Sequence, residues 1–124
     1  MTHMPPNSFA ALKLLARQAR DMTIETIPAE VAHQARLCLL DSVGCMLAGT
    51  RTQEAELVME CEPALAAEAG ATIVGTPHRR DWRGAVRVNG YLGDVLELND
   101  LIGGHASIGV VSATMALAET LGSP

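Results

Sequence analysis

Acidic and amide side chains gather in one short stretch of this sequence, NGYLGDVLELNDLIGGHAS, and a histidine stands near its end. His105 follows two glycines and precedes a pattern typical of a helix rich in small residues. Because an imidazole accepts and releases protons near neutral pH, His105 is a candidate general acid or base. The backbone N–H groups of a helix start can also bind a carboxylate. A histidine that only caps or packs against the helix would have the same spacing.

Three acids precede this histidine at intervals of three residues: Asp94, Glu97 and Asp100. If one helix ran through all three, Asp94 and Glu97 would share a face and Asp100 would lie further round it. Such a face can serve a catalytic site, and it can equally be a solvated surface. The spacing leaves both readings open.

Asn89 aligns with Ala85, Leu92 and Leu96 on one face of the same predicted helix, so we expect its amide to point inward. A buried amide must be hydrogen-bonded. Asn89 therefore either locks a turn, which we favour, or contacts a ligand.

The elements that must position these residues are mostly helical. Apolar spacing, caps and breaks predict helices over about 8–22, 28–48, 52–62, 82–100 and 106–121, a short strand over 71–74 and a loop over 75–80. Thr52 and Asp81 are the expected N-caps of the third and fourth helices, and residues 64–69 could extend the third. Gly103 and Gly104 break the chain before the last helix. We expect residues 1–7 to be disordered and 8–124 to form one partial helical domain.

Composition agrees with this pattern. Apolar residues make up 48% of the 124 residues but aromatic residues only 2%, which favours a mainly α fold, a helical bundle, over a sandwich. A net charge of -5, with scattered acids, argues against nucleic acid and anionic membrane partners. The longest apolar stretch, 37–48, is too short to span a bilayer. Because it is apolar on nearly all sides, we expect it to lie centrally.

The three cysteines are Cys38, Cys45 and Cys61, with no CxxC motif or close cysteine–histidine cluster. Cys38 and Cys45 would lie roughly 10 Å apart along one helix, whereas a disulfide needs Cα atoms within about 7 Å. We therefore expect reduced, buried thiols, no metal site and a cytoplasmic protein, since no signal peptide is evident.

Three basic residues, His78, Arg79 and Arg80, occupy the predicted loop. They could attract an acidic substrate, and they could equally form an ordinary solvated turn. The sequence favours the solvated turn.

Four segments in order resemble the N-terminal part of the 2-methylcitrate dehydratase (MmgE/PrpD) family. They are LLDSVGCMLAG at 39–49, ATIVGT at 71–76, AVRVNGYLGDVLELND at 85–100 and GHASIGVVSATMALAE at 104–119. The resemblance covers nearly all of the chain after residue 8. It implies the first part of a large all-helical domain, which in this family is joined by a smaller α/β lid, usually in a dimer.

The resemblance also implies an activity and a site. Family members remove water, remove CO2 or epimerise small di- or tricarboxylates, without a metal cofactor in the well-understood cases. By this resemblance a histidine handles the proton at the carbon beside a carboxylate. The residues expected in the site are His105, Asp100 and Glu97 as catalytic groups, and Asn99, Asn89 and Ser107 as substrate contacts.

Some positions depart from the family pattern. The family's DFDDT is ELNDL at 97–101 in this chain, and its His-Pro-Ser is His105-Ala106-Ser107. Family proteins are several times longer, and Lys13 is the only lysine here. We therefore expect a fragment or small subunit of a dehydratase-like lyase that works as a homo-oligomer or with a complementary chain. The alternatives are an epimerase or decarboxylase of the same family, or a non-catalytic helical interaction module derived from it.

Overall fold

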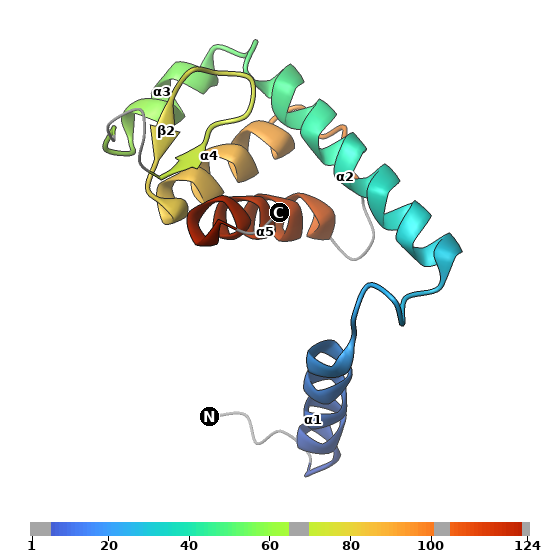
Figure 1. The fold of residues 1–124 in the computed structure, drawn as a ribbon. Helices are drawn as coiled ribbons and strands as arrows, with labels where there is room; N and C mark the ends of the chain where they lie inside the picture. The colour runs from blue at the N-terminus through green and yellow to red at the C-terminus, as the bar shows by residue number, and fades with distance from the viewer. Residues whose placement is uncertain (1–5, 65–69, 101–104, 123–124) are drawn as a thin grey trace. The chain divides into compact units, whose positions relative to one another are not determined.

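The computed structural model describes residues 6–64, 70–100 and 105–122 and is mainly helical, which confirms the predicted fold class (Figure 1). Its elements in chain order are α1 (Pro6–Asp21), α2 (Ala29–Gly49), α3 (Glu54–Glu60), β1 (Ala71–Thr72), β2 (Arg79–Arg80), α4 (Trp82–Asp94) and α5 (Ala106–Leu121). The chain divides into two compact units, Met1–Ala35 and Arg36–Pro124, and the boundary falls within α2. Disorder was expected for residues 1–7, but Pro6 and Asn7 belong to α1, so the expectation is wrong for these two residues. Residues 1–5, the helical extension at 65–69 and the break at Gly103 and Gly104 lie outside the described residues.

The first unit contains α1 and the beginning of α2. The apolar side chains that repeat along α1, Phe9, Leu12 and Leu15 among them, are exposed. A turn separates the two helices, in which the Thr26 hydroxyl donates to the Thr23 carbonyl and accepts from the Thr23 N–H, each at 2.9 Å. The helical spacing therefore predicted the helix correctly, but the side chains that show the spacing are not covered.

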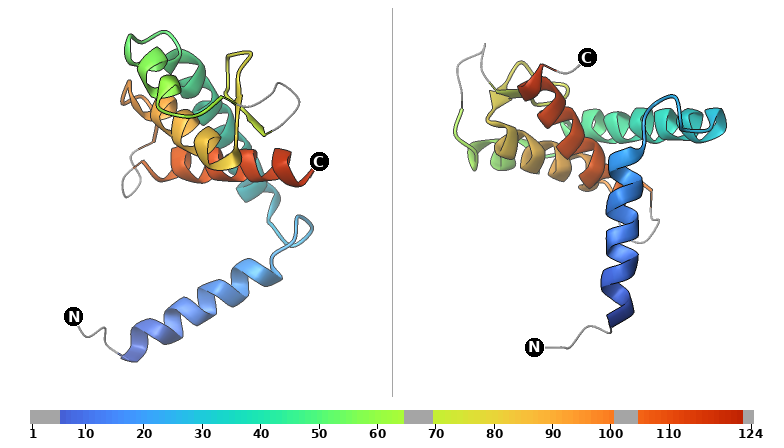
Figure 2. Two further views of the ribbon diagram at one scale, coloured as in Figure 1. Left: turned by 90° about the vertical axis from the view of Figure 1, so that its left-hand side faces the viewer. Right: turned by 60° about the horizontal axis from the view of Figure 1, so that its bottom comes forward.

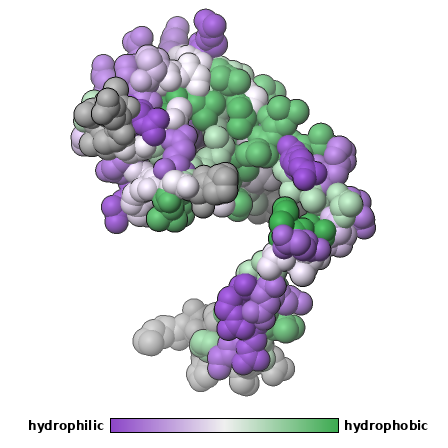
Figure 3. Space-filling view, in the orientation of Figure 1, coloured by the Kyte–Doolittle hydropathy of each residue, from purple (hydrophilic) through white to green (hydrophobic). Residues whose placement is uncertain are grey.

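The second unit begins within α2, and this helix buries only one stripe. Ser42, Cys45, Met46 and Gly49 are its buried residues, at positions i, i+3, i+4 and i+7. Leucines on its other sides are exposed, and Leu40 is 70% exposed. The central placement expected for residues 37–48 is therefore wrong. Figure 3 shows apolar side chains gathered at the surface over α2.

The core of this unit lies where α4 packs on α5, and these helices lie side by side in Figures 1 and 2. Two glycines permit close packing, Gly93 where α4 meets α5 and Gly49 where α2 meets α4. A Cβ at Gly93 would stand 2.3 Å from atoms of the Ile108 side chain, and one at Gly49 would stand 1.9 Å from the Leu92 carbonyl oxygen. The buried residues of the two helices are Gly84, Ala85, Val88, Asn89, Leu92 and Gly93 of α4 and Ile108, Val111, Ser112 and Ala116 of α5.

A two-stranded antiparallel hairpin lies against α4 and α5, with Ala71 opposite Arg80 and Thr72 opposite Arg79. The predicted strand is thus shorter than expected, and the end of the predicted loop is its partner strand. Beyond the strands one more backbone hydrogen bond joins the two arms, from the Ile73 N–H to the His78 carbonyl at 3.0 Å. The chain then turns, with the Thr76 N–H donating to the Ile73 carbonyl at 3.1 Å. Gly75, with a φ of 77°, takes the left-handed conformation that this turn requires.

The N-terminal ends of α3 and α4 differ in how they are capped. Asp81 caps α4 as predicted, and its carboxylate accepts from the Gly84 N–H at 2.8 Å. This hydrogen bond lowers the pKa of Asp81. Thr52 does not cap α3, because its hydroxyl donates instead to the Gly49 carbonyl at 2.9 Å. None of the described helices combines the length and apolar character needed to cross a membrane.

Candidate active site

The candidate site begins where α4 ends, six residues earlier than expected. The helix stops at Asp94, and Val95 closes it by donating its N–H to the Tyr91 carbonyl at 2.9 Å. The chain then turns, with the Glu97 N–H donating to the Asp94 carbonyl at 2.8 Å. The prediction of a helix through Asp100 is therefore wrong, and so is the shared helix face of Asp94 and Glu97.

The exposure of two leucines and the local residue types explain the early end of α4. Leu96 and Leu98 are exposed, so no burial of apolar surface holds a further helical turn in place. Asparagine and aspartate side chains compete for backbone and local polar partners, which favours turns over helix interiors. Glu97 takes a φ of 55°, a left-handed conformation that an α-helix does not contain.

The turn carries Asn99 back to the helix end, where it joins Asp94 and His105. The Asn99 amide nitrogen donates to Asp94 Oδ1 at 3.0 Å. His105 Nδ1 lies 2.8 Å from the same Asp94 oxygen and 2.7 Å from the Asn99 amide oxygen. Asn99 is 5% exposed, whereas the side chains of Asp94 and His105 are partly exposed. A carboxylate, an amide and an imidazole thus form one compact cluster.

This geometry assigns the proton on the imidazole. The bond from the Asn99 nitrogen to Asp94 orients the amide, so that its oxygen faces His105. Nδ1 therefore faces two acceptors and must carry a hydrogen, whether the ring is neutral or charged. In the neutral ring Nε2 is then the nitrogen with a free lone pair. The contacts with Asp94 and Asn99 thus fix the ring through Nδ1.

A second pair lies next to this cluster in the sequence. The Ser107 hydroxyl donates to Asp100 Oδ2 at 2.6 Å, so the first turn of α5 is tied to the turn after α4. The other oxygen, Asp100 Oδ1, is buried and has no partner among the described residues. His105 is the N-cap residue of α5, but its side chain makes no capping hydrogen bond. The simple capping role left open by the sequence is therefore not the one that the geometry supports.

The packing of α4 on α5 places the two halves of the cluster together. Gly93 immediately precedes Asp94, and Ile108 follows His105 by three residues. Because Gly93 has no side chain, Ile108 can approach the backbone of α4 and is 5% exposed. The close approach of the helices thus positions the carboxylate and the imidazole.

The structure brings most of the predicted site residues together, but not all of them. Asn99, Asp100, His105 and Ser107 take part in the hydrogen bonds described above. Glu97 is exposed and makes no side-chain hydrogen bond or ion pair among the described residues.

Asn89 does point inward, as expected, and is 2% exposed. Its amide accepts from the Val74 N–H at 3.0 Å and donates to the Thr72 carbonyl at 2.9 Å. These bonds fasten the hairpin to α4, which is the structural role that the sequence favoured. They do not join Asn89 to the cluster around His105.

Sequence reasoning missed the role of Asp94. It was recognised as one of three acids, but its bond to His105 depends on the early end of α4. A signal was present, because a carboxylate at the negative end of a helix is unfavourable unless another interaction compensates it. Recognising that signal would have required the correct helix end.

The basic residues of the hairpin separate into different environments. Arg79 donates to Glu119 of α5 at 3.1 Å, and Arg80 is buried and donates to the Met59 carbonyl at 3.1 Å. His78 is exposed. Two of the three residues therefore hold the fold together, and the solvated turn favoured by the sequence describes only His78.

All three cysteines are free. Their expected burial holds for Cys45 but is wrong for Cys61, which is exposed. Among the described residues, no three histidine, cysteine, aspartate or glutamate side chains are grouped so that they could hold a metal ion. The cluster around His105 combines an imidazole with a carboxylate and an amide, side chains of the kind that general acid–base chemistry uses.

Comparison with known proteins identifies the family. The family model of the MmgE/PrpD N-terminal domain matches residues 13–124, which includes every residue of the cluster around His105. No curated protein and no solved structure matches the chain. Because the family model covers most of the chain, this protein belongs to the MmgE/PrpD family and carries its N-terminal domain.

Proposed function

We propose that this chain supplies the proton-transferring histidine of a 2-methylcitrate dehydratase-like lyase, as a fragment or small subunit, and that the substrate is a small di- or tricarboxylate. One observation carries the proposal: His105 Nδ1 faces the oxygens of Asp94 and Asn99 at 2.8 and 2.7 Å. This arrangement leaves Nε2 available as a base. Membership of the MmgE/PrpD family supports it.

In the proposed reaction His105 Nε2 removes a proton from the carbon beside a substrate carboxylate. The C–H electrons form the carbon–carbon double bond, the neighbouring C–O bond breaks, and the leaving hydroxide takes a proton from solvent to become water. The imidazolium then returns its proton to solvent. Asp94 stabilises the imidazolium that forms, because its carboxylate accepts the Nδ1 hydrogen. Backbone N–H groups at the start of α5 can bind a substrate carboxylate. Asp100 and Ser107 orient the substrate.

Replacement of His105 is the direct test. His105→Gln should lower turnover of 2-methylcitrate, citrate or cis-aconitate by about 10²–10⁴-fold, since general acid–base catalysis contributes this much. The assay uses the chain alone and the chain combined with any polypeptide encoded downstream of it. The control is Glu54→Gln, which introduces a glutamine at an exposed position of α3 and should leave turnover unchanged. Unchanged turnover in His105→Gln would show that His105 is not the base.

Replacement of Asp94 tests the positioning role separately. Asp94→Asn presents an amide to Nδ1, and if its nitrogen faces the ring, the opposite tautomer is favoured and Nε2 carries the hydrogen. We expect a lower kcat with little change in KM, because substrate contacts remain. The double variant with His105→Gln should be no slower than His105→Gln alone, since both changes act on one group. Additive losses would contradict this role.

The same residues could support an epimerase or a decarboxylase. Uptake of solvent deuterium at the substrate α-carbon without loss of water would favour an epimerase. Release of CO2 would favour a decarboxylase. Formation of water and an alkene in stoichiometric amounts supports the dehydratase.

A second candidate function comes from the exposed apolar side chains of α2. Leu37, Leu39, Leu40 and Leu47 are all exposed, which suits a non-catalytic module that associates through its helices. Such a module would be a homo-oligomer or would bind a complementary chain. Sedimentation equilibrium tests this candidate, and a stable folded monomer with no added partner would count against a homo-oligomer.

A further inference from the structure

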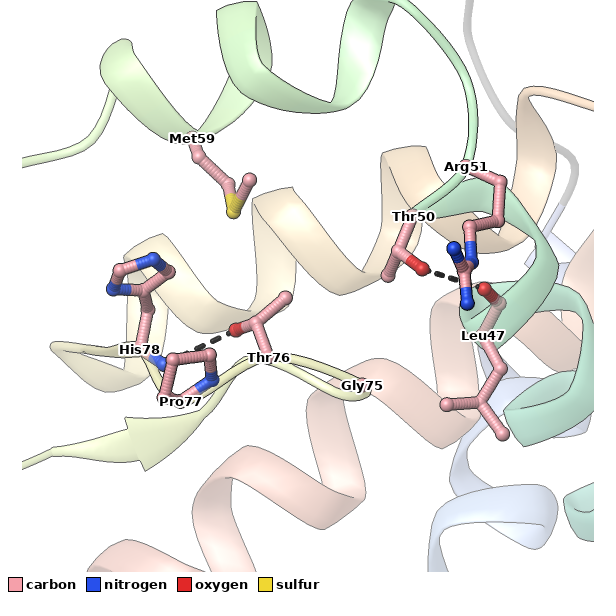
Figure 4. Close-up of a pocket in the computed structure, with 8 residues that line it drawn as sticks. All are labelled: Leu47, Thr50, Arg51, Met59, Gly75, Thr76, Pro77 and His78. Atoms are coloured by element: carbon pink, nitrogen blue, oxygen red, sulfur yellow. Dashed lines mark hydrogen bonds between the residues drawn. The ribbon is translucent and has the colours of Figure 1, made fainter.

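A pocket of about 460 Å³ opens on the second unit, in a part of it that shares no residue with the cluster around His105. Figure 4 shows that its walls come from the end of α2, from α3 and from the turn of the hairpin. A volume of this size is within the range of small-molecule sites, about 300–1,000 Å³. The lining residues are Leu47, Thr50, Arg51, Met59, Gly75, Thr76, Pro77 and His78.

Most polar groups of the pocket already have partners within the protein. The Thr50 hydroxyl donates to the Leu47 carbonyl at 2.7 Å. The Thr76 hydroxyl donates to the Ile73 carbonyl at 3.0 Å and accepts from the His78 N–H at 3.1 Å. These bonds hold the two threonine side chains and the hairpin turn in place. They leave the side chains of Arg51 and His78 to interact with a ligand.

The charge of the lining is of one sign. Arg51 carries a permanent positive charge and makes no side-chain hydrogen bond or ion pair with any other residue that the structure describes. None of the described residues that line the pocket is acidic, although the chain as a whole has a net charge of -5. His78 stands on the opposite side from Arg51 (Figure 4). A guanidinium fork without an acidic partner matches a carboxylate oxygen pair.

The rest of the lining is apolar, with Leu47, Met59 and Pro77 facing the same space. Met59 adapts its shape readily because its side chain is unbranched. We propose that this pocket binds a small aliphatic carboxylate, whose charged end pairs with Arg51 and whose hydrocarbon part contacts Leu47 and Met59. The site is separate from the proposed function, since it requires neither His105 nor turnover.

Pentanoate is a suitable probe, and amide chemical shifts of the whole chain in solution provide the readout. We expect saturable shifts at Thr50, Gly75 and Thr76 with millimolar affinity, as is usual for so small a ligand. Arg51→Gln should weaken the binding about tenfold, since it removes the charge-assisted bonds. Arg36→Gln, the same change on the exposed part of α2, is the matched control and should leave the affinity unchanged.

Pentanol serves as the neutral counterpart and should bind at least about tenfold more weakly than pentanoate. Equal shifts with pentanol, or equal weakening by Arg36→Gln and Arg51→Gln, would overturn the carboxylate assignment. So would the absence of saturable shifts around the pocket. Because every outcome is measured by binding, a failure here is distinguishable from a failure of the proposed lyase function, which is measured by turnover in His105 variants.

Discussion

Helices α2 and α4 differ in a way that their composition does not suggest. Residues 37–48 of α2 form the longest apolar stretch of the chain, yet Leu37, Leu39 and Leu40 are exposed. Helix α4 carries arginines and an asparagine, yet its Ala85, Val88 and Leu92 are fully buried. The buried face of α4 is covered because it has a helix on one side and a hairpin on another. An apolar helix face is buried only where another element packs on it, and the apolar content of a helix does not by itself provide such an element.

The comparison also explains where the candidate site lies. Helix α4 is fixed on α5 by a covered face, so the side chains at their adjoining ends are held relative to one another. Asp94 and His105 belong to those ends. Helix α2 contributes Met46 near Gly93 but none of the acid–base groups. The acid–base groups are therefore found at the adjoining ends of two helices that pack on each other over a large surface.

The largest expected effect compares one leucine from each helix. Leu92→Ala should destabilise the fold by about 3 kcal/mol, because the side chain is fully buried and its removal leaves a cavity. Leu40→Ala should change stability by less than about 0.5 kcal/mol, because Leu40 is 70% exposed. Denaturant unfolding measures both. A comparable loss in Leu40→Ala would mean that α2 is covered in solution and that the contrast between the helices is incorrect.

A second test compares two glycines of α2 itself. Gly49→Ala should cost about 2 kcal/mol, because the added Cβ would meet the Leu92 backbone. Gly44→Ala has nothing within 4 Å and should stabilise the helix by about 0.5–1 kcal/mol. Thermal unfolding of the two variants gives the difference. If both substitutions changed the melting temperature in the same direction, the end of α2 would not contact α4 as described.

The buried stripe of α2 also predicts unequal cysteine reactivity. Burial, together with the nearby charge of Asp41, raises the pKa of the Cys45 thiol. Cys61 is exposed. Cys45 should therefore react with a thiol reagent at least about tenfold more slowly than Cys61. Single-cysteine variants followed by mass spectrometry give the two rates, and equal rates would place Cys45 at the surface.

The smallest effect concerns the exposed side of α4. Arg87 donates to both carboxylate oxygens of Glu62, which lowers the pKa of Glu62 below its usual 4.5 and raises the pKa of Arg87. A lowered carboxyl pKa stabilises the fold above the unfolded pKa, and this contribution is lost as the pH falls through the folded pKa. Arg87→Gln should therefore slightly reduce stability at pH 7.

The control for this pair is Arg36→Gln, which removes an exposed arginine of α2. Unfolding curves at pH 7 and in acid should show that the difference between the wild-type protein and Arg87→Gln narrows below pH 4.5. A constant difference at all pH values would mean that Arg87 acts through packing, because only the charge pair responds to protonation of Glu62.

Much of the fold was predictable from local patterns. The Asp81 cap, Gly122 after α5 and Pro28 before α2 mark helix ends that the structure reproduces within a residue or two. Such ends depend on hydrogen bonds and backbone preferences within a few residues, so the sequence contains them. The end of α4 was not predicted, because it depends on the tertiary environment, which leaves Leu96 and Leu98 exposed.

The sequence predicts which residue types form the candidate site, but it does not predict which side chains bond to one another. It indicates His105, Asn99 and Asp100 as site residues and Asp94 only as one of three acids. The contact between the His105 imidazole and the Asp94 carboxylate forms only because the chain turns at 95–100 and α4 packs on α5. Spacing along a continuous helix could not show this bond, since the helix ends before the turn begins.

The sequence by itself determined the mainly helical class, most helix ends and the residue types of the site, because these depend on periodicity and on nearest neighbours. Tertiary structure decided which apolar faces are covered, and it decided that Asp94 and Asn99 hold the imidazole of His105. Both decisions depend on distances between helices, which Gly49 and Gly93 permit by their missing side chains. A local pattern cannot contain such distances, because they are set by residues far apart in the chain.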